Sequence, residues 1–474
     1  MTDESTFPGG QQFPDAIPAP YPDDAAAPPV APLAPAAQPV PMPPALPAYS
    51  PVSLAFRPFA AAPAQLTTLF TLFTVLGGAL ASGLLLSLGA ASFKEAPSFS
   101  KLLPAAIGMT LSGRLNSTQE VFIAQVDVNL TFLALGTLGI IGAGVFLLTR
   151  RRRRIDGSLA SLGTVAMRSG AEALAISLVS AILLGFLRSS IKDGDTHMEL
   201  KGSFLGVFLM VLLLVFVAQF LGRVGDQMLS RVPVQAATPL REVGALFWSI
   251  GVVMVPVSLV GGAIAFISKD AAGGMAVLPV YLGNLVTALV ALGSFGAVRA
   301  DTSPLANMFG GGGGEDTSKA QFAWNLMGGW SVLLFVVMLA LVALIAVRVG
   351  IRRPRLVAPD LTRTWQLPVL AWILALVFMH LLAPARVSVS ALGHDLGVGA
   401  SITWWSSMTF ALLTALASVA AEYVPAFLYS ISVPLLRLCA GSAATDGWLR
   451  GQTVTPAAAQ VAGFPATPEV TTNC

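Results

Sequence analysis

The segment that most constrains this chain runs from Leu130 to Arg154. It begins with a continuous uncharged apolar run, LTFLALGTLGIIGAGVFLLT, and a membrane-spanning helix needs about 20 such residues. Five arginines follow at once: Arg150, Arg151, Arg152, Arg153 and Arg154. A block of this kind resists translocation and marks the cytoplasmic side of a membrane. The segment therefore predicts a spanning helix whose carboxyl end faces the cytoplasm.

The composition extends this prediction to the whole chain. Hydrophobic residues make up 55% and charged residues 11% of the sequence, whereas a soluble domain has about 25% charged residues. In lipid, only helices and closed barrels satisfy their own backbone hydrogen bonds, and the apolar runs here are continuous rather than alternating. We therefore predict an all-α, polytopic integral membrane helical bundle. No basic face with interleaved aromatics is present, so we expect no nucleic-acid partner.

Nine apolar runs are candidates for spanning helices: 65–91, 130–148, 171–187, 203–221, 243–267, 277–298, 326–347, 367–383 and 402–421. A second arginine cluster follows the seventh run and includes Arg352, Arg353 and Arg355. If all nine runs cross, this cluster lies outside, against the rule for positive charge. We suspect run 243–267, because Pro256 can break the helix and return it to the same face. A kinked spanning helix is the alternative.

The runs also suggest an internal repeat. Runs one to four and six to nine share a layout at an offset of roughly two hundred residues, which favours a duplicated four-helix unit. Chance similarity of apolar sequences is the alternative. We predict five segments: a tail (1–62), a first four-helix unit (63–242), a joining segment that re-enters or spans (243–276), a second four-helix unit with an interfacial segment (277–438), and a C-terminal tail (439–474).

Two stretches outside the runs carry further expectations. The tail 1–62 is rich in Pro and Ala, so we expect it to be disordered and cytoplasmic. It is either a spacer or a docking arm for a protein partner that binds proline-rich segments. The stretch 121–130, VFIAQVDVNL, partly alternates, which predicts a short strand or hairpin outside the membrane.

Few residues suggest chemistry. The chain has no GxxxxGK[ST], HExxH, CxxC or GxSxG motif, so we expect no enzyme activity and no cofactor. Polar residues within the runs are costly in lipid and mark candidate sites; they are Gln219, Asn284 and His380. Arg168 and Glu172 are four residues apart and predict an ion pair near the membrane interface, where water reaches Glu172.

Two polar loops between runs carry potential metal ligands. One holds Asp193, Asp195 and His197, and the other holds His394 and Asp395. If the two units are repeats, both loops emerge on the same side, where imidazole and carboxylate groups suit a divalent metal. A solvated acidic loop is the simpler interpretation, so we predict no metal site and keep these residues as candidates only.

Two functions remain open at this point. The first is a non-enzymatic membrane component that binds partners through its tail, its outer loops or its helix faces. The second is a permease, or the membrane subunit of a transporter, with a path between the two four-helix units. The permease predicts a solvated cavity lined by Gln219, Asn284 or His380. Low lysine with high Ala, Gly, Val and Arg suggests a bacterial plasma membrane. Because the second run ends inside at the five arginines, the threading places the N-terminus in the cytoplasm. The lipid bilayer is the expected partner, and the sequence indicates no oligomeric state.

Overall fold

A computed structural model of the chain describes ten stretches: 62–91, 98–121, 124–152, 162–193, 196–224, 234–268, 272–301, 320–353, 361–391 and 394–449. The chain divides into two compact units, residues 1–49 and 50–474, and the description below concerns the second. The predicted Pro/Ala-rich tail, apart from residue 62, lies outside the described residues, as does most of the C-terminal tail.

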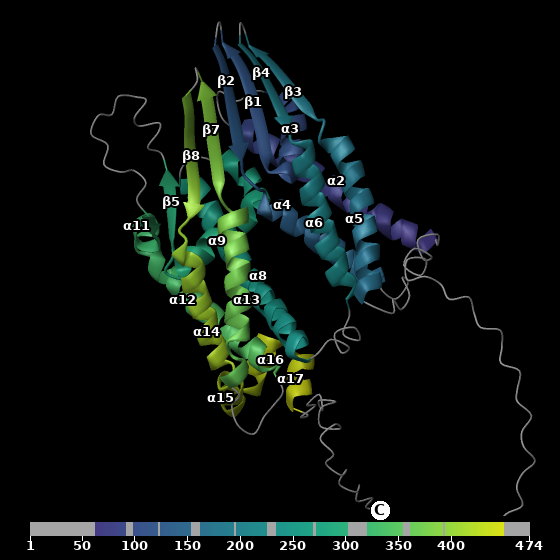
Figure 1. Ribbon diagram of the computed structural model, residues 1–474. Coiled ribbons are helices and arrows are strands. Elements are labelled where there is room, and N and C mark those ends of the chain that lie inside the picture. Colours follow the sequence, from purple (N-terminus) through teal and green to yellow (C-terminus); the bar gives the residue numbers. More distant parts are fainter. Residues whose placement is uncertain are drawn as a thin grey trace, which may run out of the picture. The chain divides into compact units, whose positions relative to one another are not determined.

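Helices make up most of the described residues (Figure 1). The helices of the first part of the chain are α2 (Ala62–Ala91), α3 (Phe99–Ser112), α4 (Leu135–Arg152), α5 (Leu162–Leu184) and α6 (Phe204–Arg223). Those of the second part are α8 (Val234–Ser268), η2 (Ala272–Val277), α9 (Leu278–Gly293), α11 (Ala323–Met327), α12 (Trp330–Gly350), η3 (Leu361–Arg363), α13 (Gln366–Ala375), the π-helix η4 (Leu376–Leu382) and α14 (Trp405–Ala420). Three short helices close the described chain: α15 (Val424–Ile431), α16 (Val433–Ala440) and α17 (Ser442–Leu449).

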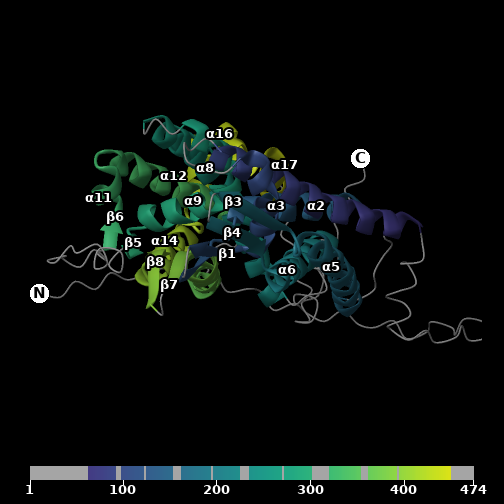
Figure 2. The same cartoon turned by 90° about the horizontal axis from the view of Figure 1, so that it is seen from above.

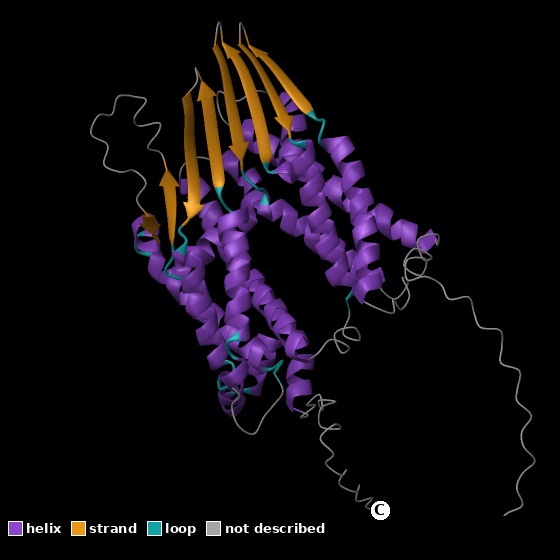
Figure 3. Cartoon of the chain, in the orientation of Figure 1, coloured by secondary structure: helices purple, strands orange, loops and turns teal. Residues whose placement is uncertain are grey.

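Eight strands form one antiparallel sheet that extends from the ends of the helices (Figure 3). They are β1 (Arg114–Val121), β2 (Ala124–Thr131), β3 (Arg188–Asp193), β4 (Thr196–Gly202), β5 (Ala297–Asp301), β6 (Ala320–Phe322), β7 (Ala385–Ala391) and β8 (His394–Ile402). Their order across the sheet is β3-β4-β1-β2-β7-β8-β5-β6. The β1–β2 hairpin confirms the strand prediction for 121–130. The sheet as a whole is an addition to the all-α prediction.

The helices confirm a multi-pass membrane protein. Among the described residues, seven helices are long and apolar enough to cross a membrane, or up to eight if the bent pair α14–α15 is one span. Helix α4 is outside that count, because its 18 residues include three arginines in the last turn. Exposed large hydrophobic side chains cover the helix surfaces, as in Leu213 at 58% and Leu339 at 68%, and lipid is the solvent that suits them.

One succession of elements occurs twice along the chain. The described elements of the first half, residues 62–223, run α2-α3-β1-β2-α4-α5-β3-β4-α6. Those of the second half, residues 234–420, run α8-α9-β5-β6-α12-α13-β7-β8-α14, with the short elements η2, α11, η3 and η4 between them. The sheet order repeats in the same way, as β3-β4-β1-β2 and then β7-β8-β5-β6. From above, the strands of the second half lie towards α12 and α14, and those of the first towards α3 and α6 (Figure 2).

The helices have a sheet end, which leads into the strands, and an arginine end opposite. Helix α4 starts just after β2 and finishes at Arg150–Arg152, and α12 starts after β6 and α11 and is followed by Arg352 and Arg353. Residues 153, 154 and 355 lie outside the described residues. Both described arginine clusters therefore lie at the end of the helices remote from the sheet.

Helix α8 is continuous through Pro256 over 35 residues. Its start lies at the arginine end, where Glu242 bonds to Arg353, and Gly262 near its finish contacts Leu278 of α9. Helix α9 stays at the sheet end instead: Asn284 near its middle bonds to the first residue of α4, and its last turn leads directly into β5. Run 243–267 therefore lies within one continuous helix, as the kinked-spanning alternative expects. Helix α9 is also among the seven membrane-length helices, but these contacts lie at the sheet end.

The two halves join at the sheet end. Strands β2 and β7 pair over six residues each, from Val126 opposite Ala391 to Thr131 opposite Arg386. Below them α4 and α9 approach so closely that a Cβ on Gly136 would overlap the carbonyl oxygen of Pro279. Glycine permits this backbone contact because it carries no side chain.

Candidate functional site

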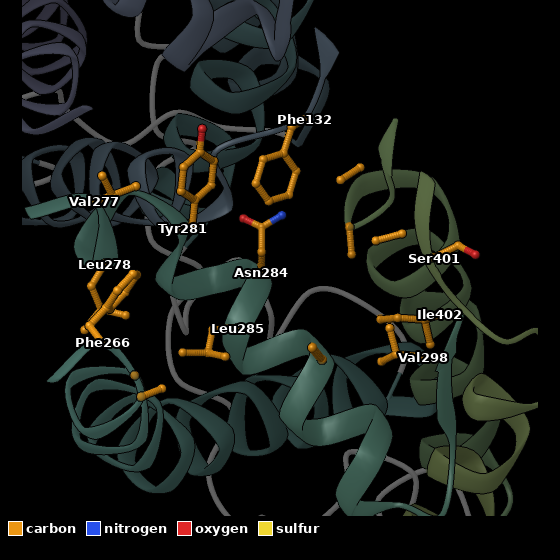
Figure 4. Close-up of a pocket in the computed structure, with 16 residues that line it drawn as sticks. Phe132, Phe266, Val277, Leu278, Tyr281, Asn284, Leu285, Val298, Ser401 and Ile402 are labelled. Carbon is orange, nitrogen blue, oxygen red and sulfur yellow. The ribbon is translucent and has the colours of Figure 1, made fainter. Parts of the chain in front are cut away.

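An apolar cavity of about 600 Å³ lies where α9 meets the base of the second-half strands. Phe132 from the first half, Phe266 of α8 and Tyr281 of α9 form part of its wall, and Val298 and Ile402 of β5 and β8 form the opposite part (Figure 4). A volume of this size lies within the range of small-molecule sites, about 300–1,000 Å³. The cavity is therefore large enough for a ligand.

The space between helix and sheet is packed differently in the two halves. In the first half, helix α3 places Leu102 and Ala105 against Leu115 and Leu200 of β1 and β4. In the second half, the strand side of the cavity combines small residues with larger apolar ones, Val298 and Ile402, and space remains between them and α9.

Asn284 is the principal polar group of the cavity wall. Its side chain is 9% exposed, and its Oδ1 accepts a hydrogen bond of 3.0 Å from the backbone N–H of Leu135. That bond satisfies the first turn of α4, whose N–H groups have no partner within the helix. The bond also fixes the amide orientation, so the Nδ2 group faces the other way, towards the space between Phe132 and Ile402 (Figure 4). No acceptor for Nδ2 lies among the described residues.

Tyr281 lies one turn before Asn284 on α9. Its ring stacks on Phe132 of the first half, with ring centroids 4.4 Å apart. Such offset or stacked aromatic pairs stabilise by about 0.5–1.5 kcal/mol beyond their area burial. Tyr281 and Asn284 therefore hold the first half against the second while they also line the cavity.

A buried ion network joins α5 to α6. Glu172 is fully buried and bonds to Arg168 at 3.0 Å and to Arg223 at 2.5 Å. Arg223 also donates to Ser169 at 2.9 Å and to the Gln219 oxygen at 3.4 Å. The predicted pair of Arg168 and Glu172 is confirmed, but water does not reach Glu172, because Arg223 and the neighbouring helix enclose it.

A second network lies at the arginine end of the second half. Arg353 bonds to Glu242 of α8 at 2.8 Å and to Glu422 after α14 at 2.6 Å. It also donates to the Ser418 hydroxyl at 2.8 Å, and that hydroxyl donates to the carbonyl of Thr364. Burial lowers the pKa of Arg353, but the hydrogen bonds and charges of Glu242 and Glu422 outweigh it and hold that pKa above its ordinary value. One guanidinium thus ties together four segments of the chain.

The structure separates the three polar residues singled out within the runs. Asn284 lines the cavity, whereas Gln219 is fully buried in the α5–α6 network. His380 lies on the π-helix η4, partly buried, and its Nε2 has no partner among the described residues. The cavity is not lined by Gln219 or His380, so these residues do not share a site.

The strand order separates the two metal-ligand loops. His197 lies on β4 and His394 on β8, with β1, β2 and β7 between those strands. Four strand spacings amount to about 19 Å, which is too far for one ion to bridge. Residue 195 and the side chains of Asp193, His197, His394 and Asp395 lie outside what the structure describes. The described residues contain no group of three potential metal ligands.

The sequence pattern gave no sign of the cross-helix partners. Arg223, Glu242 and Arg353 each bond to a residue more than fifty positions away, and no local pattern indicates such partners. The available signal was the presence of positive and negative side chains at the same end of neighbouring runs.

Comparisons with protein-family models, with curated proteins and with solved structures find no match to this chain.

Proposed function

We propose that the chain is a non-enzymatic, multi-pass component of the plasma membrane that binds protein partners through its outward-facing sheet. The observation that carries this is the open sheet: β3 and β6 are its outermost strands, and among the described residues each is paired on one side only. An unpaired strand edge offers backbone N–H and C=O groups to another chain. The charged groups inside the bundle support the same conclusion, because ion pairs that join helices occupy them.

In this proposal the two halves are structural repeats. The recurring element order supports it, and so does the backbone that links helix to strand: Gly113 after α3 and Phe295 after α9 both have φ of 63°. Phe295 is the only described non-glycine residue with positive φ, a conformation that side chains disfavour. Helix α8 then corresponds to α2 and opens the second repeat, rather than joining two four-helix units.

The threading follows from the same arrangement. If the arginine end is cytoplasmic, then α2, α5, α8 and α13 run outwards and α4, α6, α12 and α14 run inwards. Helices α3 and α9 remain on the outer side beneath the sheet. Both arginine clusters then lie inside with eight crossings, which removes the conflict that nine crossings create.

Cysteine labelling tests this threading. In a variant without Cys439 and Cys474, a cysteine at Ser190 of β3 or Arg386 of β7 should react with a membrane-impermeant maleimide added to intact cells. A cysteine at Arg151 should react only after permeabilisation. Labelling of the Arg151 variant in intact cells would reverse the map.

The permease alternative receives less support. Its predicted solvated path needs Gln219, Asn284 or His380 on the wall of a polar cavity. The cavity found here is apolar and includes only Asn284 of the three. It also lies at the sheet end, where Asn284 contacts the start of α4, so it does not lead through the bundle.

Photo-crosslinking tests the binding surface. Benzoyl-phenylalanine placed at Ser190 of β3 or at Gln321 of β6 should give discrete crosslinked species in intact cells. Asn129 of β2 is the matched control, because its strand is paired with β1 and β7 on both sides and should give none. Equal crosslinking at the edges and at Asn129, or none at either edge, would contradict the proposal.

A further inference from the structure

We infer that the cavity between α9 and the second-half strands binds one acyl chain of a bilayer lipid, with the Asn284 amide donating to the ester carbonyl of that chain. Two features of the cavity carry this inference. One is a buried hydrogen-bond donor without an acceptor, and the other is an apolar wall around it.

The donor is specific because its orientation is fixed. The backbone N–H of Leu135 donates both to the amide oxygen of Asn284 and to the carbonyl of Leu133. Since only the oxygen of the amide accepts, the amide nitrogen lies on the opposite side, between Phe132 and Ile402 (Figure 4). Buried polar groups almost always have partners, and an exception calls for an explanation. A ligand carbonyl next to Nδ2 supplies the missing acceptor.

The wall excludes a hydrophilic ligand. Apart from Tyr281, Asn284 and Ser401, the residues that line the cavity are apolar or glycine. Water in contact with such a wall gains few hydrogen bonds from it, because three polar side chains are the only ones that line the cavity. An apolar chain with one acceptor group matches the lining better than water or a charged solute.

The position of the cavity identifies the bilayer as the source. Phe266 of α8 lines it, and the neighbouring Ile264 and Ile267 are 54% and 60% exposed on the surface of a helix that suits lipid. Asn284 lies beside the first residue of α4, where the helices give way to the strands. In the threading proposed above, on which this step rests, the hydrocarbon core ends and the headgroups begin at this level, so an ester carbonyl would lie beside the amide.

Photolabelling in nanodiscs tests the inference with two matched probes. One is a phospholipid whose chain carries a diazirine and an ester linkage; the other has the same chain in ether linkage, without the carbonyl. We expect adducts on peptides from 262–288 and 383–402. Since a neutral hydrogen bond contributes a factor of about five to binding, the ester probe should label about fivefold more than the ether probe. In Asn284→Leu this ratio should fall to about one.

Cavity-filling variants provide the controls. Ala288→Phe on α9 and Ala400→Phe on β8 should each reduce labelling by both probes at least tenfold, whereas Val260→Phe, on the exposed surface of α8, should not. Two filling variants on different elements keep the test decisive if one fails to fold. Unchanged labelling in the folded filling variants overturns the site, and an ester-to-ether ratio unaffected by Asn284→Leu overturns the role of the amide. Competition by free oleate but not by unlabelled phospholipid would overturn the assignment to a bilayer lipid.

Discussion

Glu172→Ala should lower the free energy of unfolding by about 3–5 kcal/mol, the cost of removing one partner from a buried ion network. The carboxylate bonds two guanidinium groups at once, on α5 and α6, and is fully buried. Its removal takes away the negative charge that the guanidinium groups of Arg168 and Arg223 share. Unfolding by SDS, followed by circular dichroism of the purified protein, measures the change.

Glu199→Ala is the control for that experiment. Glu199 also pairs with an arginine, Arg188 of β3, but the two side chains are 35% and 65% exposed and 3.4 Å apart. Exposed pairs contribute about 0–1 kcal/mol, so this variant should unfold nearly as the wild type does. If Glu172→Ala and Glu199→Ala unfold at the same SDS concentration, the interior network does not stabilise the fold.

Arg353→Ala should have an effect of similar size, about 3–5 kcal/mol, in the second half. The side chain bonds Glu242 and Glu422, which are then left as two nearby carboxylates with no cation between them. Arg353→Lys should recover only part of the loss, because an ammonium group does not match the two-pronged contact with Glu242. The same SDS titration reports both variants.

A double variant separates repulsion from lost attraction. Glu242→Gln in the Arg353→Ala background removes one of the two carboxylates, so it should recover stability if their mutual repulsion contributes. A further loss in the double variant, equal to that of Glu242→Gln alone, would show that the carboxylates do not interact.

Apolar composition was enough to predict the membrane helices, because continuous runs of about 20 apolar residues have few other stable states in water or lipid. The strands were harder. Only 121–130 was predicted as a hairpin, although Val387 and Val389 alternate with Arg386 and Ser388 in the same manner. Pairing of β2 with β7 joins residues more than 250 positions apart, and no local pattern reports such a contact.

The candidate site shows the same limit. The sequence marks Asn284 as a costly polar group inside an apolar run, but its partner is the backbone of Leu135, 149 positions away. Pro256 suggests either a break or a kink in its run, and α8 continues through it. Packing against other helices compensates the proline in a bundle, and that compensation cannot be read from the run itself.

The β2–β7 ladder and the α4–α9 contact restrict how the two halves can move. Both connections lie at the same end of the bundle, so that end acts as a fixed hinge between the two halves. Separating the halves at the sheet end would require breaking interstrand hydrogen bonds, whereas they can move apart at the arginine end without breaking those bonds. A transport cycle that opens the two ends of the bundle in turn is incompatible with such a hinge.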